Sequence, residues 1–363
     1  MARIEAIELH HRLLVMRRPF VTAVRTAYSM DAVFVEVRDS DGRRGWGEAP
    51  TSWRVTGESV AAVTAAVEGP LSEALMGRRS DDPEAAGAAM DAAVARNNSS
   101  RSALDCALFD LAAQERGTPL WRYLGGSSPL VSSDMTLSAL GADGDLDTLL
   151  ATAAEHLALG ITTLKLKAGG GADDVAVARA LRDAVGHEVA LRIDANQAWD
   201  RDEAVRTIRA LEDAGVDVEL VEQPVSADDI DALAAVSAAV DTPIMADESV
   251  WTTRQLREVI ARRGAEMVNV KLAKAGGLRE ARALVELARR HEVGVVVGCM
   301  AESHVGVAAA AALATTGPPQ VHDLDGGRWL SQSPVEGGVD YDGAHITLSP
   351  AAGLGIRSLH STP

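Results

Sequence analysis

The chain has 363 residues, of which 47% are hydrophobic, and its formal net charge is −17. This length favours two domains, or one barrel with a cap, over a single ordinary domain. An acidic surface repels phosphate backbones and anionic lipid, which argues against nucleic acid and membrane partners. The N-terminus lacks the apolar stretch of a signal peptide, and no run approaches a membrane span, so we expect a cytoplasmic protein.

The first part of the chain is predicted to hold a strand meander followed by helices. Residues 4–15 and 32–39 alternate apolar and polar side chains, and GWGEAP closes the meander. The basic segment RRPFVTAVRTAYS between them has no strong period, which predicts a loop that acts as a lid. Residues 58–117 have a helical pattern, and RSALDCALFDLAAQERGTPLWRYLGG is predicted as an amphipathic helix.

From about residue 132, short apolar strands alternate with Ala-rich helices at a spacing of roughly 25 residues. Such an alternation is typical of a parallel sheet, and eight strands predict a closed barrel. The predicted strands are DMTLSAL, TTLKLK, VALRID, VELVEQP, TPIMADES, AEMVNVKL, VGVVVGCM and PQVHDLD. The rest of the chain, from about residue 330, contains strand-like pieces such as GAHITL and is expected to return to the N-terminal domain. Cys106 and Cys299 lie among apolar neighbours, which predicts buried thiols.

Charged residues stand at the ends of successive predicted strands, where barrel enzymes place their active sites. Asp194, Glu222 and Asp247 end three consecutive strands, so their carboxylates should converge. Oxygen ligands without His or Cys favour Mg²⁺. The alternative is that these carboxylates form structural ion pairs with nearby lysines.

The lysines of the predicted barrel divide by strand. Lys165 and Lys167 are two residues apart on the second strand, so both face the barrel mouth. Lys271 ends the sixth strand, opposite the second, so Lys167 and Lys271 should face one another across the metal. This geometry suits the removal of a proton from one face of a planar intermediate and its return to the other. Positive charge from Mg²⁺, Lys165 and Lys274 is expected to lower the lysine pKa values.

The motifs LKLK, DANQAW, EQP, ADES and VKLAKAGG, in this order and at barrel spacing, resemble those of the muconate-lactonizing subgroup of the enolase superfamily. The resemblance covers essentially the whole chain. It implies an α/β fold, a modified TIM barrel (β/α)7β with an α+β capping domain, and a Lys base acting with Mg²⁺. The mandelate-racemase subgroup is disfavoured, because the sixth strand ends in Lys271 and His304 falls on the following helix.

On this reading, residues 1–125 form the capping domain, with a specificity loop near 17–30. Residues 126–328 form the barrel, and residues 329–363 return to the cap. The catalytic pair is Lys167 and Lys271, and the metal ligands are the three strand-end carboxylates. The supporting residues are Asn196, Glu248 and Lys274, and the substrate-binding residues are Arg25, Ser138, Lys165, Asp323 and Asp325.

The substrate is suggested by Asp323 and Asp325, which face the mouth from strand eight and would suit a substrate ammonium group. They resemble the Asp-x-Asp signature of dipeptide epimerases; a hydrogen-bonding turn with Gly326 and Gly327 is the alternative. The basic loop resembles the specificity loop of L-Ala-D/L-Glu epimerases, which implies that Arg25 binds a substrate carboxylate. After the Asp pair, GGRWL departs from the epimerase pattern.

The sequence therefore predicts a Mg²⁺-dependent dipeptide epimerase, an isomerase. It would invert the α-carbon of the C-terminal residue of an L,L-dipeptide such as Ala-Glu. An N-succinylamino acid racemase or o-succinylbenzoate synthase is the next alternative, and a muconate cycloisomerase the third. A non-catalytic binding protein would lack ligands or bases, and none is missing. The resemblance also implies a homo-oligomer, either a dimer or an octamer.

Overall fold

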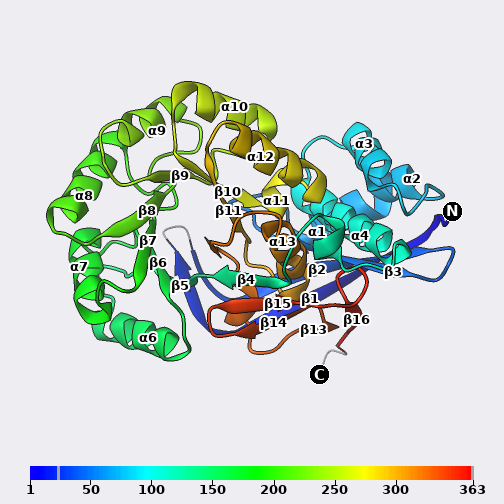
Figure 1. Ribbon diagram of the computed structural model, residues 1–363, viewed down its shortest axis with the longest axis horizontal. Coiled ribbons are helices and arrows are strands. Elements are labelled where there is room, and N and C mark those ends of the chain that lie inside the picture. Colours follow the sequence, from blue (N-terminus) through cyan, green and yellow to red (C-terminus); the bar gives the residue numbers. More distant parts are fainter. Residues whose placement is uncertain (23–24, 361–363) are drawn as a thin grey trace.

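The computed structural model describes residues 1–22 and 25–360. An antiparallel three-stranded sheet, in the order β1-β2-β3, opens the fold and is followed by a group of helices (Figure 1). The strands are β1 (Ile4–Thr22), β2 (Arg25–Asp39) and β3 (Arg44–Pro50). The helices are α1 (Val60–Ala66), the π-helical turn η1 (Val67–Leu71), α2 (Ser72–Leu75), α3 (Pro83–Ala93), α4 (Asn98–Glu115) and α5 (Leu120–Tyr123).

The segment predicted as a loop near 17–30 differs from the prediction. β1 and β2 pair from Ile4↔Asp39 to Thr22↔Arg25, with a register shift between Val15 and Phe20, so most of the segment is a β-ribbon. The loop was predicted because the segment lacks an alternation of apolar and polar residues. Backbone hydrogen bonds across the hairpin stabilise the strands without that alternation. Arg25 begins β2, but its side chain lies outside the described residues.

Helix α4 was predicted to be amphipathic, and this is wrong, because it is buried on nearly all sides. It packs against β3 and against the barrel helices α11 (Leu272–Ala275) and α12 (Leu278–Arg290). Two buried carboxylates of this helix accept hydrogen bonds from backbone amides of distant segments. Asp110 accepts hydrogen bonds from the amides of Trp46 and Leu354, at 2.9 and 2.8 Å, and Asp105 accepts one from Arg279 at 3.1 Å. A helix between two layers has no solvent face to show as a polar stripe.

The barrel is built from the predicted alternation of strands and helices. Its parallel sheet has the order β11-β10-β9-β8-β7-β6-β5. The strands are β5 (Met135–Leu137), β6 (Thr163–Lys167), β7 (Ala190–Asp194), β8 (Val218–Glu222), β9 (Ile244–Ala246), β10 (Met267–Lys271) and β11 (Gly294–Gly298). The helices between them are α6 (Leu146–Ala158), α7 (Asp174–Val185), α8 (Arg201–Asp213), α9 (Ile230–Ser237), α10 (Thr253–Arg262), α11 and α12, and they curve around the outside of the strands (Figure 1).

The first barrel strand is split, and the barrel closes through it. β4 (Leu130–Ser133) and β5 are separated by Asp134. β12 (Val321–His322) runs parallel to β4, and a parallel bridge joins Gly298, at the end of β11, to Asp323. The predicted eight-stranded barrel is therefore confirmed.

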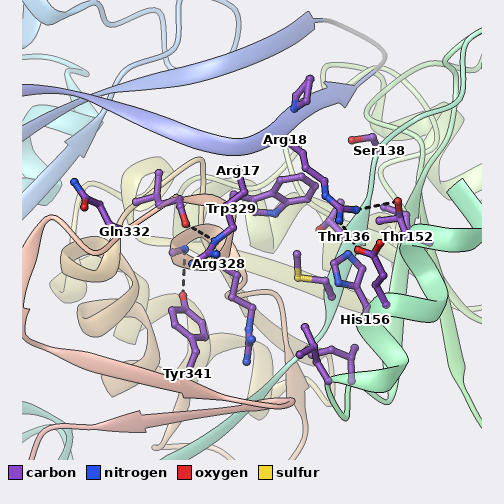
Figure 2. Close-up of a pocket in the computed structure, with 18 of the residues that line it drawn as sticks. Arg17, Arg18, Thr136, Ser138, Thr152, His156, Arg328, Trp329, Gln332 and Tyr341 are labelled. Carbon is purple, nitrogen blue, oxygen red and sulfur yellow. Dashed lines mark hydrogen bonds and ion pairs between the residues drawn. The ribbon is translucent and has the colours of Figure 1, made fainter. Parts of the chain in front are cut away.

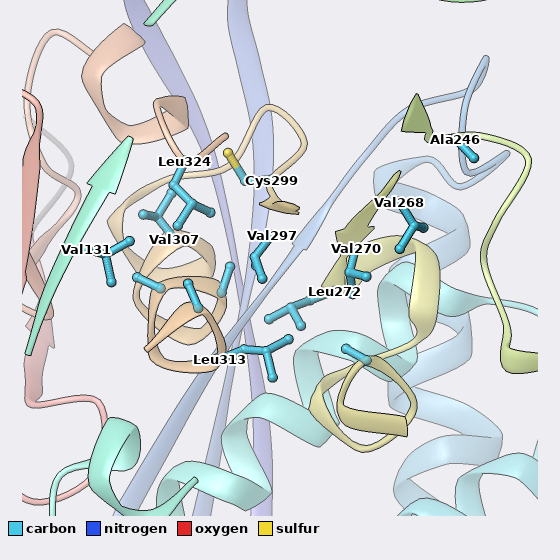
Figure 3. Close-up of a cluster of buried hydrophobic side chains, with 14 of the residues drawn as sticks. Val131, Ala246, Val268, Val270, Leu272, Val297, Cys299, Val307, Leu313 and Leu324 are labelled. Atoms are coloured by element: carbon cyan, nitrogen blue, oxygen red, sulfur yellow. The ribbon is translucent and has the colours of Figure 1, made fainter. Parts of the chain in front are cut away.

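Most barrel helices begin with a sequence signal for a helix start. Asp173, Asp200 and Asp229 cap α7, α8 and α9 by accepting hydrogen bonds from first-turn amides. Thr252 and Gln255 form a reciprocal capping box on α10. Helix α13 (His304–Ala314) is apolar all round, and its side chains pack with those of β10 and β11, including Val270 and Val297 (Figure 3).

The C-terminal tail divides between barrel and cap, whereas the prediction returned it to the cap alone. Its strands are β13 (Val335–Gly337), β14 (Val339–Asp342), β15 (His345–Leu348) and β16 (Ile356–Leu359). β15 pairs with the barrel strand β4. A bridge joins Leu330 to Met16 of β1, and the Leu354 amide donates to Asp110 of α4. The GAHITL strand prediction is confirmed.

Two further predictions bear on the class of protein. Cys106 and Cys299 are both buried free thiols, as predicted. Within residues 1–22 and 25–360, no helix has both the length and the apolar character needed to cross a lipid bilayer.

Candidate active site

A cavity of about 140 Å³ opens at the carboxyl ends of the barrel strands. The residues around it come from every part of the chain. Met16, Arg54 and Val55 belong to the capping part, and sequence reasoning missed all three. The predicted site residues that line the cavity are Lys165, Lys167, Asn196, Asp247, Glu248, Lys271, Asp323 and Asp325. The structure therefore brings most of the predicted site together.

One side of the site is built on the register of three adjacent strands. Lys167 of β6 lies opposite Asp194 of β7, and Asp194 lies opposite Glu222 of β8. Lys167 Nζ contacts Asp194 Oδ2 at 2.5 Å. Asn196, whose φ of 45° places it in the left-handed region, donates its backbone amide to Asp194 Oδ1 at 2.9 Å. This turn holds the Asp194 carboxylate against the lysine.

The opposite side is built around Lys271 at the end of β10. Its Nζ lies 2.8 Å from Asp247 Oδ2 and 3.7 Å from Glu222 Oε1. Lys274, only 1% exposed, lies behind Asp247 with its Nζ 2.5 Å from Asp247 Oδ1, and also donates to the Val250 and Asn269 carbonyls. Lys274 therefore positions Asp247 from behind and does not line the cavity.

The lowering of the lysine pKa is predicted with Mg²⁺ bound and stays a prediction, whereas the protein's own groups shift the pKa of Lys271 in the opposite direction. Burial alone favours its neutral form, but Asp247 and Glu222 outweigh burial and raise the pKa of Lys271 well above its usual value. Lys165 acts in the predicted, lowering direction, but its effect is smaller. Burial lowers the pKa of Lys274 itself. Among the protein's own groups, carboxylates therefore determine the charge of Lys271.

Asp323 and Asp325 both line the cavity, as their alternation on the last strand predicted. Asp323 Oδ1 contacts Lys165 Nζ at 2.5 Å. Burial favours the neutral form of Asp323, but Lys165, Lys271 and Lys167 together outweigh burial and hold the Asp323 pKa below its usual range. Asp325 Oδ2 accepts the Thr136 amide at 2.8 Å and the Trp329 indole N–H at 3.0 Å. The Asp325 carbonyl also accepts the Arg328 amide at 2.8 Å and so begins the Gly326–Trp329 turn, which means that the alternative of a hydrogen-bonding turn stays open beside the ammonium-binding role.

Asn269 is a residue that sequence reasoning missed. It is fully buried on β10, and its side-chain amide donates to Glu222 Oε1 at 2.8 Å and to Asp323 Oδ2 at 3.0 Å. The signal for it was its place two residues before Lys271, which puts both side chains on the same face of the strand. Asn269 joins the carboxylate group around Glu222 to the Asp pair.

Several oxygens around the carboxylates are suited to a cation. Glu248 Oε2 and Asn196 Oδ1 are buried and accept no hydrogen bond from any described residue, and Glu222 Oε2 has only an ion-pair contact with Lys165 Nζ at 3.5 Å among the described residues. Burial, together with the nearby Asp194, raises the Glu222 pKa to about 7, so one more positive charge would favour its ionised form. A buried oxygen without a donor is costly, and such oxygens are the ligands that Mg²⁺ prefers.

The same carboxylates are occupied by the protein's own cations. Over the described part of the chain, no three acidic, His or Cys side chains stand grouped as a metal centre, because Asp194 and Asp247 face Lys167 and Lys271. These contacts are the ion pairs that sequence analysis left open as the alternative. The residue types fit Mg²⁺. In this structure the lysines neutralise the carboxylate charge that Mg²⁺ would neutralise when bound.

Ser138 does not line this cavity. It follows β5 and lines a second, larger cavity, of about 870 Å³, between α6, the β1 ribbon and the C-terminal tail (Figure 2). Of the side chains that the structure describes, Thr136 and Trp329 alone line both cavities. Its predicted role at the substrate backbone stays a prediction, as does that of Arg25.

Comparison with known proteins places the chain in a family. Residues 4–125 match the family described as "Mandelate racemase / muconate lactonizing enzyme, N-terminal domain", and residues 148–360 match the one described as "Enolase C-terminal domain-like". The L-Ala-D/L-Glu epimerase of Bacillus subtilis is 39% identical over 357 residues, with 98% of this chain and 96% of the relative covered. The solved substrate-liganded complex of that epimerase has a TM-score of 0.95 at 38% identity, covering 99% of this chain and 100% of the other.

Two further relatives mark the range of reactions in this family. A dipeptide epimerase from Enterococcus faecalis, solved in complex with Mg and L-Leu-L-Tyr, has a TM-score of 0.93 at 34% identity, covering 98% of this chain and 100% of the other. The N-succinyl-L-Arg/Lys racemase of Bacillus cereus is 30% identical over 367 residues, covering 98% of this chain and 95% of the relative. The predicted resemblance and fold are confirmed, and the chain belongs to the mandelate racemase/muconate lactonizing enzyme family of the enolase superfamily.

Proposed function

We propose that this protein is a dipeptide epimerase that inverts the α-carbon of the C-terminal residue of an L,L-dipeptide such as Ala-Glu. The observation that carries the proposal is the shared cavity of Lys167, Lys271 and the Asp323–Asp325 pair. Two lysines on opposite barrel strands suit proton transfer at both faces of a carbon. Two carboxylates beyond the metal set suit the ammonium of a dipeptide. The Bacillus subtilis relative is named for this activity.

The two lysines would share the proton transfer. Lys167 would take the α-proton from one face, and Lys271 would return a proton to the other face of the planar intermediate. Because the two side chains come from β6 and β10, neither has to cross the substrate plane. Both lysines are largely buried, so each proton transfer takes place out of bulk water, and the lysine protons exchange with solvent between turnovers.

Mg²⁺ is proposed as the cofactor, held by Asp194, Glu222 and Asp247. When bound, it would bind the substrate carboxylate, stabilise the charge that develops at the α-carbon, and offset the carboxylates that raise the Lys271 pKa. Asn196 and Glu248 would support this group through their contact at 3.4 Å. Lys274 positions Asp247 from the side away from the substrate.

The substrate would be held at both ends. Asp323 and Asp325 would accept hydrogen bonds from the α-ammonium of the first residue, and Lys165 would keep Asp323 ionised through their contact at 2.5 Å. Arg25 is proposed to bind the side-chain carboxylate of the second residue, and Ser138 to contact the substrate backbone. A dimer or octamer in the cytoplasm stays a prediction.

The test is proton exchange. L-Ala-L-Glu and a small library of L,L-dipeptides are incubated with the protein and Mg²⁺ in D₂O, and α-deuterium is followed by NMR or mass spectrometry. We expect deuterium at the C-terminal α-carbon together with the appearance of the L,D epimer. The absence of α-deuterium from every dipeptide would overturn the proposal.

A paired substrate test separates this activity from that of an N-succinylamino acid racemase. An N-succinyl amino acid has no ammonium, so the double variant Asp323→Asn, Asp325→Asn should leave turnover of such a substrate intact. The same variant should lose dipeptide epimerisation. If the variant kept dipeptide turnover, the Asp pair would not be the ammonium site.

A further inference from the structure

The boundary between the two cavities is formed by a small hydrogen-bonded unit. Among the residues whose side chains the structure describes, the large cavity of about 870 Å³ and the mouth of about 140 Å³ share only Thr136 and Trp329. The Thr136 backbone amide and the Trp329 indole N–H both donate to Asp325 Oδ2, at 2.8 and 3.0 Å. Thr136, Asp325 and Trp329, here called the partition, therefore separate the mouth from the larger space.

The backbone beneath the indole has little room to shift. A Cβ on Gly326 would lie 2.6 Å from the Glu302 carbonyl oxygen, and one on Gly327 would lie 2.7 Å from the Tyr341 hydroxyl. The Gly327 amide donates to that hydroxyl at 3.1 Å. The two glycines thus let the Gly326–Trp329 turn pack directly against α13 and the tail, and this packing fixes the position of Trp329.

The turn is also tied to the β1 ribbon on its other side. Leu330 bridges to Met16, and the Arg17 guanidinium donates to the Leu330 carbonyl at 2.6 Å (Figure 2). The indole is half-buried, and its N–H bond to Asp325 orients the ring toward the boundary. Trp329 is therefore held from three directions: by the tail, by β1 and by Asp325.

We infer that Trp329 determines the size of the first residue that the enzyme accepts, and that it restricts this residue to a small side chain such as that of Gly, Ala or Ser. The inference rests on the proposed function. If Asp325 binds the ammonium of the first residue, that residue's α-carbon is one bond from the ammonium and its side chain starts beside the indole. A long side chain would need the space that Trp329 separates from the mouth. Trp329 is part of the GGRWL departure from the epimerase pattern.

The experiment compares first residues at a constant second residue. Epimerisation of L-Ala-L-Glu, L-Leu-L-Glu and L-Phe-L-Glu is measured as kcat/KM for the wild type, Trp329→Ala and Trp329→Phe. We expect the wild type to prefer Ala over Phe by about tenfold or more. Trp329→Ala, which joins the two cavities, should shift the Phe-to-Ala ratio by about tenfold or more towards Phe. Trp329→Phe keeps an aromatic ring at the boundary, so its ratio should stay close to that of the wild type.

The matched control is Leu159→Ala. Leu159 is 61% exposed and lines only the large cavity, so this variant enlarges that cavity without opening the partition. Its Phe-to-Ala ratio should equal that of the wild type. Circular dichroism confirms that each variant is folded.

The outcomes separate the two proposals. Equal wild-type rates with Ala and Phe at the first position would overturn the inference even if Trp329→Ala failed to fold. An unchanged ratio in a folded Trp329→Ala variant would also overturn it, while epimerisation by the wild type would leave the proposed function standing. If the wild type exchanged no dipeptide at all, the proposed function would fail and the inference with it.

Discussion

The side-chain amide of Asn269 donates to Asp323 Oδ2 at 3.0 Å, and the same nitrogen donates to Glu222 Oε1 at 2.8 Å. One buried amide therefore sets the spacing between a proposed metal ligand and a proposed ammonium ligand. Because both carboxylates accept from the same nitrogen, a shift of one carboxylate would move the Asn269 amide and thereby change its hydrogen bond to the other.

Asn269→Leu should weaken the binding of metal and of dipeptide together. Leu is close to Asn in volume but donates no hydrogen bond, so Glu222 and Asp323 each lose a donor. We expect the Mg²⁺ concentration for half-maximal activity and the dipeptide KM both to rise, by about 10–100-fold. Gln320→Leu is the control, since Gln320 does not line the cavity and its side-chain amide donates to the Val295 carbonyl. A change in only one of the two constants would contradict the shared role.

Replacing either proposed catalytic lysine should strongly reduce epimerisation but keep proton exchange on one face of the α-carbon. Lys167→Ala and Lys271→Ala should each reduce epimerisation by about 10²–10⁴-fold, because inversion needs a base on both faces. Each variant should still exchange the α-proton of one epimer, and the two variants should exchange opposite epimers. Separate D₂O assays on L-Ala-L-Glu and L-Ala-D-Glu measure this. Full epimerisation by either variant would exclude the two-base scheme.

Glu48 of β3 joins the cap to the barrel, and its loss should destabilise the fold. Its carboxylate accepts hydrogen bonds from the amides of Ser303 and Gly306, both at 2.9 Å, and from the Ser303 hydroxyl at 2.6 Å. Glu48→Ala leaves buried amides at the start of α13 unpaired, which should lower the free energy of unfolding by about 2–4 kcal/mol. Thermal unfolding measures the effect, and Glu5→Ala, on the exposed part of β1, should change little.

Asp105 should make stability depend on pH. Burial raises the pKa of Asp105 from 3.8 to about 7, even though the Arg279 amide hydrogen bond favours the charged form. Because the folded state holds this proton more tightly than the unfolded state does, the contribution is present below about pH 4 and is lost as the pH rises to about 7. Asp105→Asn should therefore flatten the pH profile of the free energy of unfolding over this range.

The measurement for Asp105 is urea unfolding at pH values from 4 to 8. The control is Asp183→Asn, since Asp183 is exposed on α7 and should keep the wild-type slope. If Asp105→Asn and the wild type had the same slope, the burial of Asp105 would not govern the pH dependence of stability.

The barrel could be predicted from the sequence because its signals are local. Each strand is a short apolar run, and most of the strands end near a charge that the parallel topology carries to the same edge. Lys165, Lys167, Lys271 and the Asp pair follow from that rule and the alternation of side chains. Position along a strand is enough to place these residues at the cavity, whereas their contacts with one another are not visible in the sequence.

The remaining features depend on contacts between distant segments. The burial of α4 depends on Trp46 and Leu354, which satisfy Asp110 from opposite ends of the chain. The β1–β2 ribbon forms through backbone pairing, which cannot be predicted from the residue types of the segment. Asn269 seemed an ordinary polar residue in a strand, because the partners that make it important lie on two other strands.

The split first strand has a consequence for synthesis on the ribosome. β4 pairs with β12 and β15, and both of these strands lie in the last part of the chain. Until Leu348 has been translated and has left the exit tunnel, β4 lacks at least one of its two neighbours, so the nascent barrel stays open at the seam. A chaperone that binds exposed strand edges would find its target there, at Leu130–Ser133, late in translation.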